Sequence, residues 1–190
     1  TGTDSGANAL FKRLGIARVK NLPIFLETLK LLHVTGPLKS KNLASVSCSG
    51  GEASLVADIA CGYEVVFPEL NDRQTHDLRE ALGPMVALAN PLDYHTYIWR
   101  DTKAMTLAWS AIMDPSIALT LLILDFPRSD RCDASDWQCA IDAAISSKKN
   151  TESNVAVVAT LPELLPEEIS QKLIMSGIVP MFGIDETISA

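Results

Sequence analysis

The sequence predicts an α/β fold, in which a doubly wound parallel sheet lies between two layers of helices. From residue 43 onward, short apolar runs alternate with amphipathic stretches of helical periodicity. Glycine, proline and asparagine mark the junctions between them. The run over 117–125 is almost continuously apolar, which is typical of a central strand covered on both faces.

The composition is that of an ordinary globular protein. The 190 residues are 47% hydrophobic and 21% charged, which suffices for one sizeable domain with an appendage. The formal net charge of −7 argues against nucleic acid or an anionic membrane surface as the main partner. The longest apolar run is far short of the roughly 20 residues that span a bilayer. We therefore expect no nucleic-acid partner and no membrane partner.

The cysteines indicate a reducing compartment. Four of them are scattered without a C-x-x-C pair, at positions 48, 61, 132 and 139. In a chain of this length the pattern favours free thiols and a cytoplasmic location. Cys132 and Cys139 have no histidine nearby to complete a zinc set, so we predict no metal site. The chain starts at Thr1 without a methionine, and we expect it to be a fragment of a longer protein.

Two helices are expected before the alternating part of the chain. The first covers 4–14 and ends at Gly15, a residue that favours a C-terminal cap. The second begins after Asn21, which can cap its first turn. Its apolar residues form one stripe, made of Leu22, Phe25, Leu26, Leu29 and Leu32.

A polar connector rich in helix breakers follows over 35–41. It is the best candidate for a domain boundary in the chain. We therefore expect residues 1–36 to belong to a preceding domain and residues 37–190 to form the α/β domain.

Six strands and six helices are expected in the α/β domain, each from its periodicity and its punctuation. The strands are expected over 43–48, 63–67, 86–88, 117–125, 154–159 and 178–182. The first four helices are expected over 50–61, 72–82, 101–113 and 134–147, and two more follow Pro166 and Asp185. Asn71 and Gln74 resemble a capping box that opens the second of these helices, and Asp185 is expected to cap the last.

The turn at Ser49-Gly50-Gly51 is the candidate site. It joins an apolar strand to a helix, an arrangement that presents backbone amides and a positive helix end to an anion. Adjacent glycines let a ligand approach the backbone, and Ser47 could assist from the strand end. Asn90 and Asp93, which follow a neighbouring strand, are expected to support the same site.

Other interpretations of this turn remain open. Ser49 and Glu52 also fit a capping box, in which the two residues satisfy the first amides of the helix themselves. The turn lacks the lysine of a P-loop and the spaced glycines of a dinucleotide fingerprint. A hydrolase nucleophile elbow is disfavoured because no histidine follows Asp125. A nucleophilic Cys48 is disfavoured because no base can be assigned to it.

The order of several motifs resembles one enzyme family along essentially the whole chain. The motifs are Ser49-Gly50-Gly51, Leu55-x-Ala57-Asp58, Gly62, Pro68-Glu69-Leu70, Asn90-Pro91-Leu92-Asp93, Asp114-Pro115 and Gly177-Ile178-Val179-Pro180-Met181-Phe182. Together they are similar to the nucleoside-diphosphate-forming acyl-CoA synthetases, relatives of ADP-forming acetate–CoA ligase and of succinyl-CoA synthetase. The resemblance implies a flavodoxin-like, three-layer α/β/α fold with strand order near 2-1-3-4-5 and a short extra strand.

The resemblance also implies a function. Such enzymes interconvert acyl-CoA, ADP and phosphate with a carboxylic acid, CoA and ATP through a phosphohistidine relay. Their other parts are a CoA-binding domain, a histidine-bearing domain and a nucleotide-binding ATP-grasp domain or subunit, and Mg²⁺ accompanies the nucleotide. Residues 37–190 match the ligase-type domain, whose helix N-terminus at Ser49-Gly50-Gly51 faces the phosphohistidine. The resemblance also implies that the full-length protein forms an oligomer.

The N-terminal segment matches the end of the histidine-bearing domain. Thr1-Gly2-Thr3-Asp4 resembles the residues that follow the family's His-Thr-Gly motif, and no histidine occurs before His33. The resemblance therefore places the phosphohistidine upstream of Thr1, and we expect this fragment to hold no catalytic residue and to be inactive alone. The chain departs from the family at Glu52, where a small or apolar residue is usual, and at Ala89, where glycine is usual.

Two other functions remain open on the same fold. A non-catalytic module for assembly, hinge motion or regulation would need no anion at the glycine turn. A flavodoxin-like domain could also bind FMN, although the chain has no obvious hydroxyl-rich phosphate loop.

Overall fold

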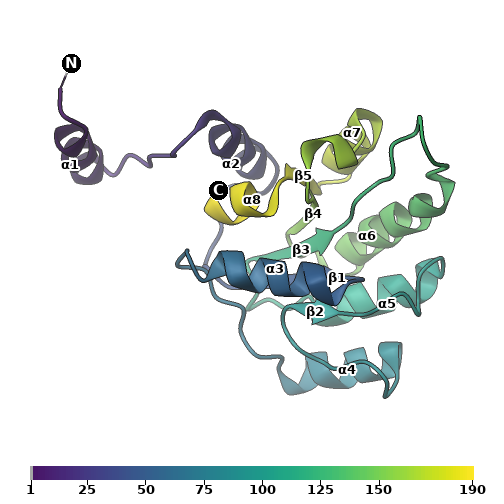
Figure 1. Cartoon of the computed structure of the whole chain (residues 1–190). Coiled ribbons are helices and arrows are strands. Elements are labelled where there is room, and N and C mark those ends of the chain that lie inside the picture. The colour runs from purple at the N-terminus through teal and green to yellow at the C-terminus, as the bar shows by residue number, and fades with distance from the viewer. Residues whose placement is uncertain (1) are drawn as a thin grey trace.

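Five parallel strands form one sheet in the order β2-β1-β3-β4-β5, which confirms the expected flavodoxin-like order (Figure 1). The computed structural model describes residues 2–190, so Thr1 of the N-terminal match lies outside the described residues. The strands are β1 (Leu43–Ser47), β2 (Leu92–Asp93), β3 (Leu119–Ile123), β4 (Val155–Ala159) and β5 (Val179–Phe182). The central strand, β3, is buried along its whole length, as its apolar run predicts.

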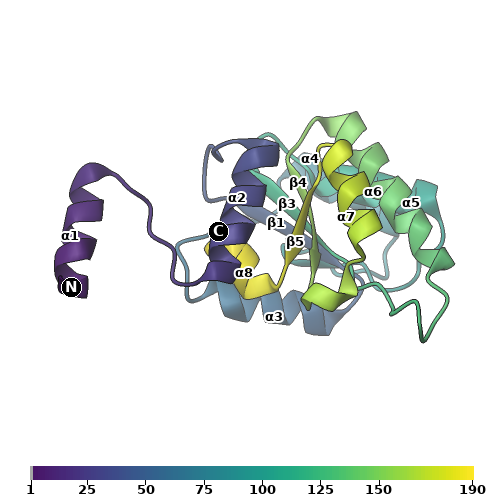
Figure 2. The ribbon, with the colours of Figure 1, turned by 90° about the horizontal axis from the view of Figure 1, so that it is seen from above.

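Helices cover both faces of the sheet and give three layers (Figure 2). One face carries α4 (Asp72–Leu82), α5 (Thr102–Ile112), α6 (Gln138–Thr151) and α7 (Glu167–Met175). The other carries α2 (Leu22–Thr35), α3 (Gly50–Ala60) and α8 (Ile184–Ser189). The remaining helix, α1 (Asp4–Leu14), buries none of its residues and lies apart from the rest of the chain in both views.

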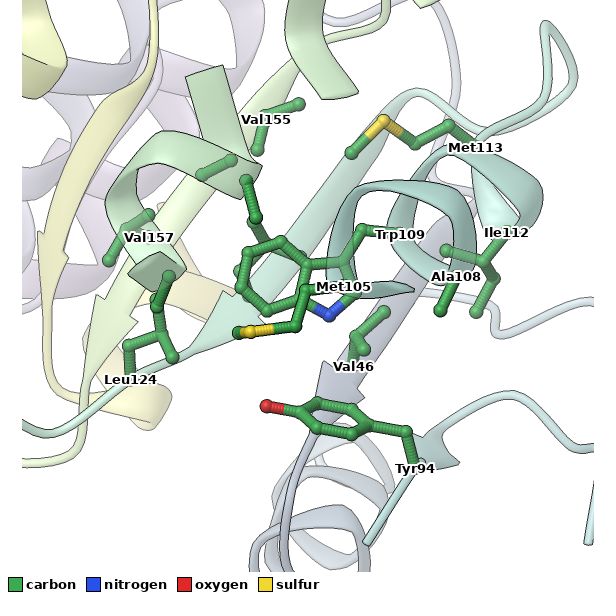
Figure 3. Close-up of a cluster of buried hydrophobic side chains, with 14 of the residues drawn as sticks. Val46, Tyr94, Met105, Ala108, Trp109, Ile112, Met113, Leu124, Val155 and Val157 are labelled. Carbon is green, nitrogen blue, oxygen red and sulfur yellow. The ribbon is translucent and has the colours of Figure 1, made fainter. Parts of the chain in front are cut away.

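The larger part of the core lies under α5. Met105, Ala108, Trp109 and Ile112 are at most 1% exposed, as their helical spacing predicts. The Trp109 indole meets the Tyr94 ring edge-on at 6.2 Å between centroids, close to Met105 (Figure 3). These side chains pack on alternate residues of the strands, and the residues between them face the second cluster under α2, α3 and α8.

The outer edge of β1 differs from the sequence expectation. The expected strand at 63–67 is reduced to a single bridge between Asn42 and Val66, and 86–88 forms no strand. The side-chain amide of Asn90 occupies the gap, because its Oδ1 accepts from Ser45 N at 3.1 Å and its Nδ2 donates to Leu43 O at 2.9 Å. Pairing resumes only after this residue, where β2 lies beside the end of β1.

Two of the N-terminal helix caps expected from the sequence are present in the structure. Asn21 caps α2, and Asn71 with Gln74 forms the expected capping box on α4. Asp185 does not cap the last helix, since Gly183 is its N-cap. Instead the Asp185 carboxylate accepts a hydrogen bond from the Tyr63 hydroxyl at 2.9 Å, which ties α8 to the segment after α3.

The helix α2 binds to the sheet through residues that the apolar stripe does not include. Ile24, Glu27 and Leu31 are buried, whereas the five stripe residues are 44–66% exposed. The Glu27 carboxylate accepts from Phe182 N at 3.0 Å and pairs with Lys30 at 2.8 Å. The Lys30 ammonium lies 3.7 Å from the centroid of the Phe182 ring. The domain boundary expected between residues 36 and 37 stays a prediction. The helix before this boundary, α2, packs closely on β5.

Residues 2–190 contain no helix that is both long and apolar enough to cross a membrane.

Candidate functional site

The glycine turn lies where the strand order reverses, at the carboxyl ends of β1 and β2. Ser49 is the N-cap of α3 in an extended conformation, and its side chain makes no capping hydrogen bond. The capping-box interpretation of Ser49 and Glu52 is therefore wrong within the described chain. The first amides of α3 have no intrahelical partners by helix geometry, so they remain available at the turn.

The predicted turn residues differ in accessibility. Ser47 is 1% exposed and its hydroxyl donates to Ser49 O at 3.0 Å, so it holds the turn together. Gly50 and Gly51 are exposed at the helix start. A Cβ on Gly50 would lie 3.2 Å from Asp93 Oδ2, tighter than ordinary contacts, whereas one on Gly51 would meet its nearest neighbour, Ser49 Oγ, at 3.5 Å. Only at the first glycine would an added Cβ require a neighbour, the Asp93 carboxylate, to shift.

Of the two expected supporting residues, the structure brings one to the turn. The Asp93 carboxylate lies beside the start of α3, where it accepts from His95 N at 2.8 Å. Its other oxygen is 3.5 Å from His95 Nδ1. Asn90 lies along the middle of β1 and also donates to Pro68 O at 3.1 Å, so its amide is engaged with backbone.

A cavity of about 230 Å³ opens next to the turn. Its lining residues come from the carboxyl ends of β1 and β3, the first turn of α3, the segment after β2 and the turn before α6. They are Cys48, Glu52, Thr96, Trp99, Ile123, Leu124, Asp125 and Trp137. A larger cavity of about 390 Å³ lies at the amino ends of β1 and β3, beside Leu43 and Leu119. Parallel sheets place their ligands at the carboxyl ends, which favours the smaller cavity.

Glu52 is an acidic side chain of this cavity whose carboxyl group is partly buried. Its Oε2 atom is buried and has no hydrogen-bond partner among the described residues. Burial, followed by the negative charges of Asp125 and Asp93, raises the pKa of Glu52 to about 7. Burial also raises the pKa of the Cys48 thiol, and Glu52 adds to the effect. Cys48 is therefore a poor nucleophile, as the sequence indicates.

Hydrogen bonds fix the part of the cavity wall that carries Asp125 and Trp137. The Asp125 carboxylate accepts from Thr160 N at 2.7 Å and from the Thr160 hydroxyl at 2.6 Å. Trp137 Nε1 donates to Asp125 O at 2.8 Å. The Trp99 and Trp137 rings lie at 72° to each other with 5.4 Å between their centroids. Two indoles and one carboxylate thus form a preorganised corner.

The segment that carries Trp99 has a strained backbone. His95 has φ 58° and Arg100 has φ 71°, in the left-handed region that residues other than glycine rarely adopt. Asp93 holds the first of these through its bond to the His95 amide. Such strain persists where the surrounding structure fixes it, and it concentrates at functional sites.

Sequence reasoning missed most of the cavity. Asp125 directly follows the central apolar run, so its place at a strand end was a usable signal. Trp99 and Trp137 follow no periodic pattern that would bring them together. Within residues 2–190, no group of three or more histidine, cysteine or acidic side chains could hold a metal ion. The four cysteines are free thiols.

No protein-family model and no curated protein sequence matches the chain. Among solved structures, PH0766 from Pyrococcus horikoshii OT3 superposes with a TM-score of 0.80 at 19% identity, covering 100% of this chain and 43% of that one. A structure described as "dinucleotide forming Acetyl-coenzyme A synthetase 1" from Ca. Korarchaeum cryptofilum, in complex with phosphate and ADP, gives 0.79 at 15% identity. The match covers 100% of this chain and 40% of the synthetase, and the apo form gives the same values. The chain thus spans about two fifths of these structures and shares their fold.

Proposed function

We propose that this chain is part of a nucleoside-diphosphate-forming acyl-CoA synthetase, an acid–thiol ligase. The enzyme would interconvert acyl-CoA, ADP and phosphate with a carboxylic acid, CoA and ATP. The observation that carries the proposal is the superposition of the entire chain on the synthetase that was solved with phosphate and ADP. The order of the sequence motifs supports it independently. Residues 37–190 would form the ligase-type domain, and residues 1–36 the end of a histidine-bearing domain.

The glycine turn would assist transfer of a phosphoryl group carried by a histidine. The histidine takes the γ-phosphoryl group of ATP and releases ADP, then passes it to the carboxylate to give an acyl phosphate. The CoA thiol displaces phosphate from that intermediate. Such transfers depend on positioning and on charge stabilisation. The amides of Gly50 and Gly51, at the positive end of α3, would supply both to the phosphoryl oxygens.

Two carboxyl groups beside the turn, those of Glu52 and Asp93, would repel an anion bound there if both were fully charged and unpaired. Because the pKa of Glu52 is raised to about 7, this group is partly neutral near pH 7 and repels an anion less than an ordinary glutamate would. The Asp93 carboxylate is already engaged by the His95 amide. Both features lessen the conflict between the acidic side chains and a phosphoryl group.

The remaining components would come from outside this chain. The described residues offer no metal cluster, so Mg²⁺ would be bound with the nucleotide in an ATP-grasp domain or subunit. CoA would be held by a CoA-binding domain. We accordingly expect the fragment to be inactive alone, and the full-length enzyme to be a cytoplasmic oligomer.

Labelling of the full-length gene product tests the relay. The protein is incubated with γ-³²P-labelled ATP and Mg²⁺, and a base-stable, acid-labile phosphoprotein is expected. The label should be discharged when CoA and a carboxylic acid substrate are added. Absence of label in a folded protein that still binds nucleotide would contradict the relay.

A charge at the turn should abolish turnover without disturbing the fold. Gly51→Asp brings a negative side chain to the amides, and we expect kcat of the full-length enzyme to fall by about 100-fold or more. Gly51→Ala is the matched control, because the added Cβ meets its nearest neighbour at an ordinary 3.5 Å and carries no charge. It should retain activity within about threefold. Equal activity of the two variants would remove the turn from the mechanism.

A non-catalytic assembly or hinge module is the second candidate. The observation that favours it is the placement of two acidic side chains, Glu52 and Asp93, at the helix end that would receive the anion. This candidate predicts no phosphoprotein and no effect of Gly51→Asp on any turnover, while the full-length protein still assembles.

A further inference from the structure

The two indoles meet edge to face and form one corner of the cavity. Trp99 and Trp137 lie at 72° to each other and both line the 230 Å³ cavity. A cation in that corner lies near both ring systems, whose π faces carry negative charge density. Trp137 is fixed by its hydrogen bond to Asp125 O, so the corner exists before a ligand arrives.

The charges of the cavity also favour a cation. Asp125 and Glu52 line it, and no lysine or arginine is among its lining residues. The Glu52 Oε2 atom is buried without a partner among the described residues, which is costly for a carboxylate. A cation close to Glu52 would compensate this charge, whereas an anion in the cavity would add a third negative group.

The kind of cation follows from the lining. A hard metal ion requires several oxygen ligands, but both Asp125 oxygens already accept hydrogen bonds from Thr160. The other walls are indole rings, Ile123 and Leu124, which suit methyl groups. The volume of about 230 Å³ is below that of sites for drug-sized ligands, so the guest is small.

We propose that the cavity between Trp99, Trp137 and Glu52 binds an alkylated ammonium group, with the onium charge against the indoles and the Glu52 carboxylate. The proposal does not depend on the phosphoryl relay, because it concerns the cavity and not the amides of the turn. Occupation of the cavity would place a positive charge next to Glu52, which also reduces its repulsion of an anion at the start of α3.

Calorimetric titration of the 190-residue chain with choline tests this site. The measurement is made at pH 8, where Glu52 is mostly ionised, and 3,3-dimethylbutan-1-ol serves as the uncharged isostere. We expect saturable choline binding at one site and an affinity for the isostere that is weaker by about tenfold or more. Absence of choline binding, or equal affinity for both compounds, would overturn the proposal.

Variants locate the site. Trp99→Ala and Glu52→Gln should each weaken choline binding by about tenfold. Tyr97→Ala is the control, because Tyr97 is 68% exposed on the same segment and does not line the cavity. Circular dichroism checks that each variant is folded. Glu52→Gln keeps the size of the side chain and decides the question if Trp99→Ala fails to fold.

A second measurement reports on contact with the carboxyl group directly. The pKa of Glu52 is followed by NMR with and without saturating choline. A bound cation should lower it from about 7 toward the ordinary value for glutamate. Choline binding that leaves this pKa unchanged, or that is the same in Trp99→Ala and wild type, would contradict the assigned cavity.

Discussion

The Glu52 carboxyl group lies in the first turn of α3, and its environment makes stability depend on pH. Its folded-state pKa of about 7 lies above the unfolded value, so the folded state holds its proton more tightly. The contribution of this group to stability is then fully present below the unfolded pKa and is lost as pH rises through about 7. The neighbouring Cys48 thiol and Tyr94 hydroxyl have raised pKa values, so they stay neutral in this range.

Glu52→Gln should remove the loss of stability that ionisation of Glu52 causes at high pH. We expect the variant to be more stable than wild type at pH 8 by about 2 kcal/mol, after allowance for solvent screening, and the difference to vanish near pH 4. Urea unfolding at both values of pH measures it. Glu69→Gln, at an exposed position, is the control and should show no such dependence. A difference that is constant with pH would mean that ionisation of Glu52 does not cause it.

At the residue scale, the sequence predicted that Asp93 lies near the glycine turn, because both follow strands whose carboxyl ends meet at one edge of a parallel sheet. It offered Glu52 as a capping-box partner of Ser49 and as a departure from the family pattern, but not as a residue that lines a cavity. Trp99, Asp125 and Trp137 could not be grouped, because they lie in the segment after β2, at the end of β3 and in the turn before α6, which meet only once the sheet has formed. A sequence pattern reports periodicity within an element, not proximity between loops.

At the element scale, two helices with similar sequence starts differ in how they begin. Asn71 and Gln74 form a reciprocal capping box on α4, whereas the Ser49 side chain makes no bond to α3. Both sites read S/T/D/N-x-x-E/Q in the sequence, so the pattern alone did not separate them.

Alanine substitution at the two caps should therefore have different effects. Asn71→Ala is expected to lower the free energy of unfolding by about 1 kcal/mol, because it leaves the first turn of α4 without its acceptor. Ser49→Ala should change it by less than about 0.3 kcal/mol. Paired denaturant curves measure both. A loss in Ser49→Ala equal to that in Asn71→Ala would mean that Ser49 caps α3 in solution.

The edge of β1 shows why the strands expected at 63–67 and 86–88 do not form. Apolar runs at 63–67 and 86–88 satisfy the composition of strands. The position beside β1 is nevertheless filled by Asn90, whose amide mimics a peptide group with one acceptor and two donated bonds. A side chain that replaces a ladder cannot be recognised from periodicity.

Asn90→Ala should be among the most destabilising polar substitutions. It leaves Ser45 N and Leu43 O without their partners in a buried strand, and we expect a loss of about 2–3 kcal/mol in the free energy of unfolding. Asn150→Ala, at an exposed helical position, is the control and should cost less than about 0.5 kcal/mol. A loss in Asn90→Ala no larger than that of the control would mean that water replaces the amide readily.

At the scale of the whole molecule, the alternation of elements predicted a parallel sheet between two layers of helices. The strand order came from the resemblance to the synthetase family and not from the alternation. The sequence did not predict how the two N-terminal helices differ. Periodicity marks the same kind of apolar stripe on both, but α1 buries nothing and α2 buries Ile24, Glu27 and Leu31. Which side of a helix meets the sheet depends on the partner surface.

Deletion of the two helices should separate their contributions. Removal of residues 1–16 eliminates α1 and should shift the melting temperature by less than about 2 °C, because no buried contact is lost. Removal of residues 1–36 also takes away α2 with Ile24 and Leu31, and we expect a further loss of about 4 kcal/mol. Calorimetric melting of the two truncations measures this. Equal melting temperatures would mean that α2 detaches from β5 in solution.

The contact between Glu27 and Phe182 has one more consequence, for self-association. Along β5 the amide of Gly183 donates inward to Ala159 O, so by alternation the outward amides belong to Pro180 and Phe182. Proline has no N–H, and Glu27 accepts the other. Within the described residues, the outer edge of β5 thus offers no free amide donor to a strand of another molecule. Loss of α2 would expose that donor, and it would turn a protected border into a template for edge-to-edge aggregation.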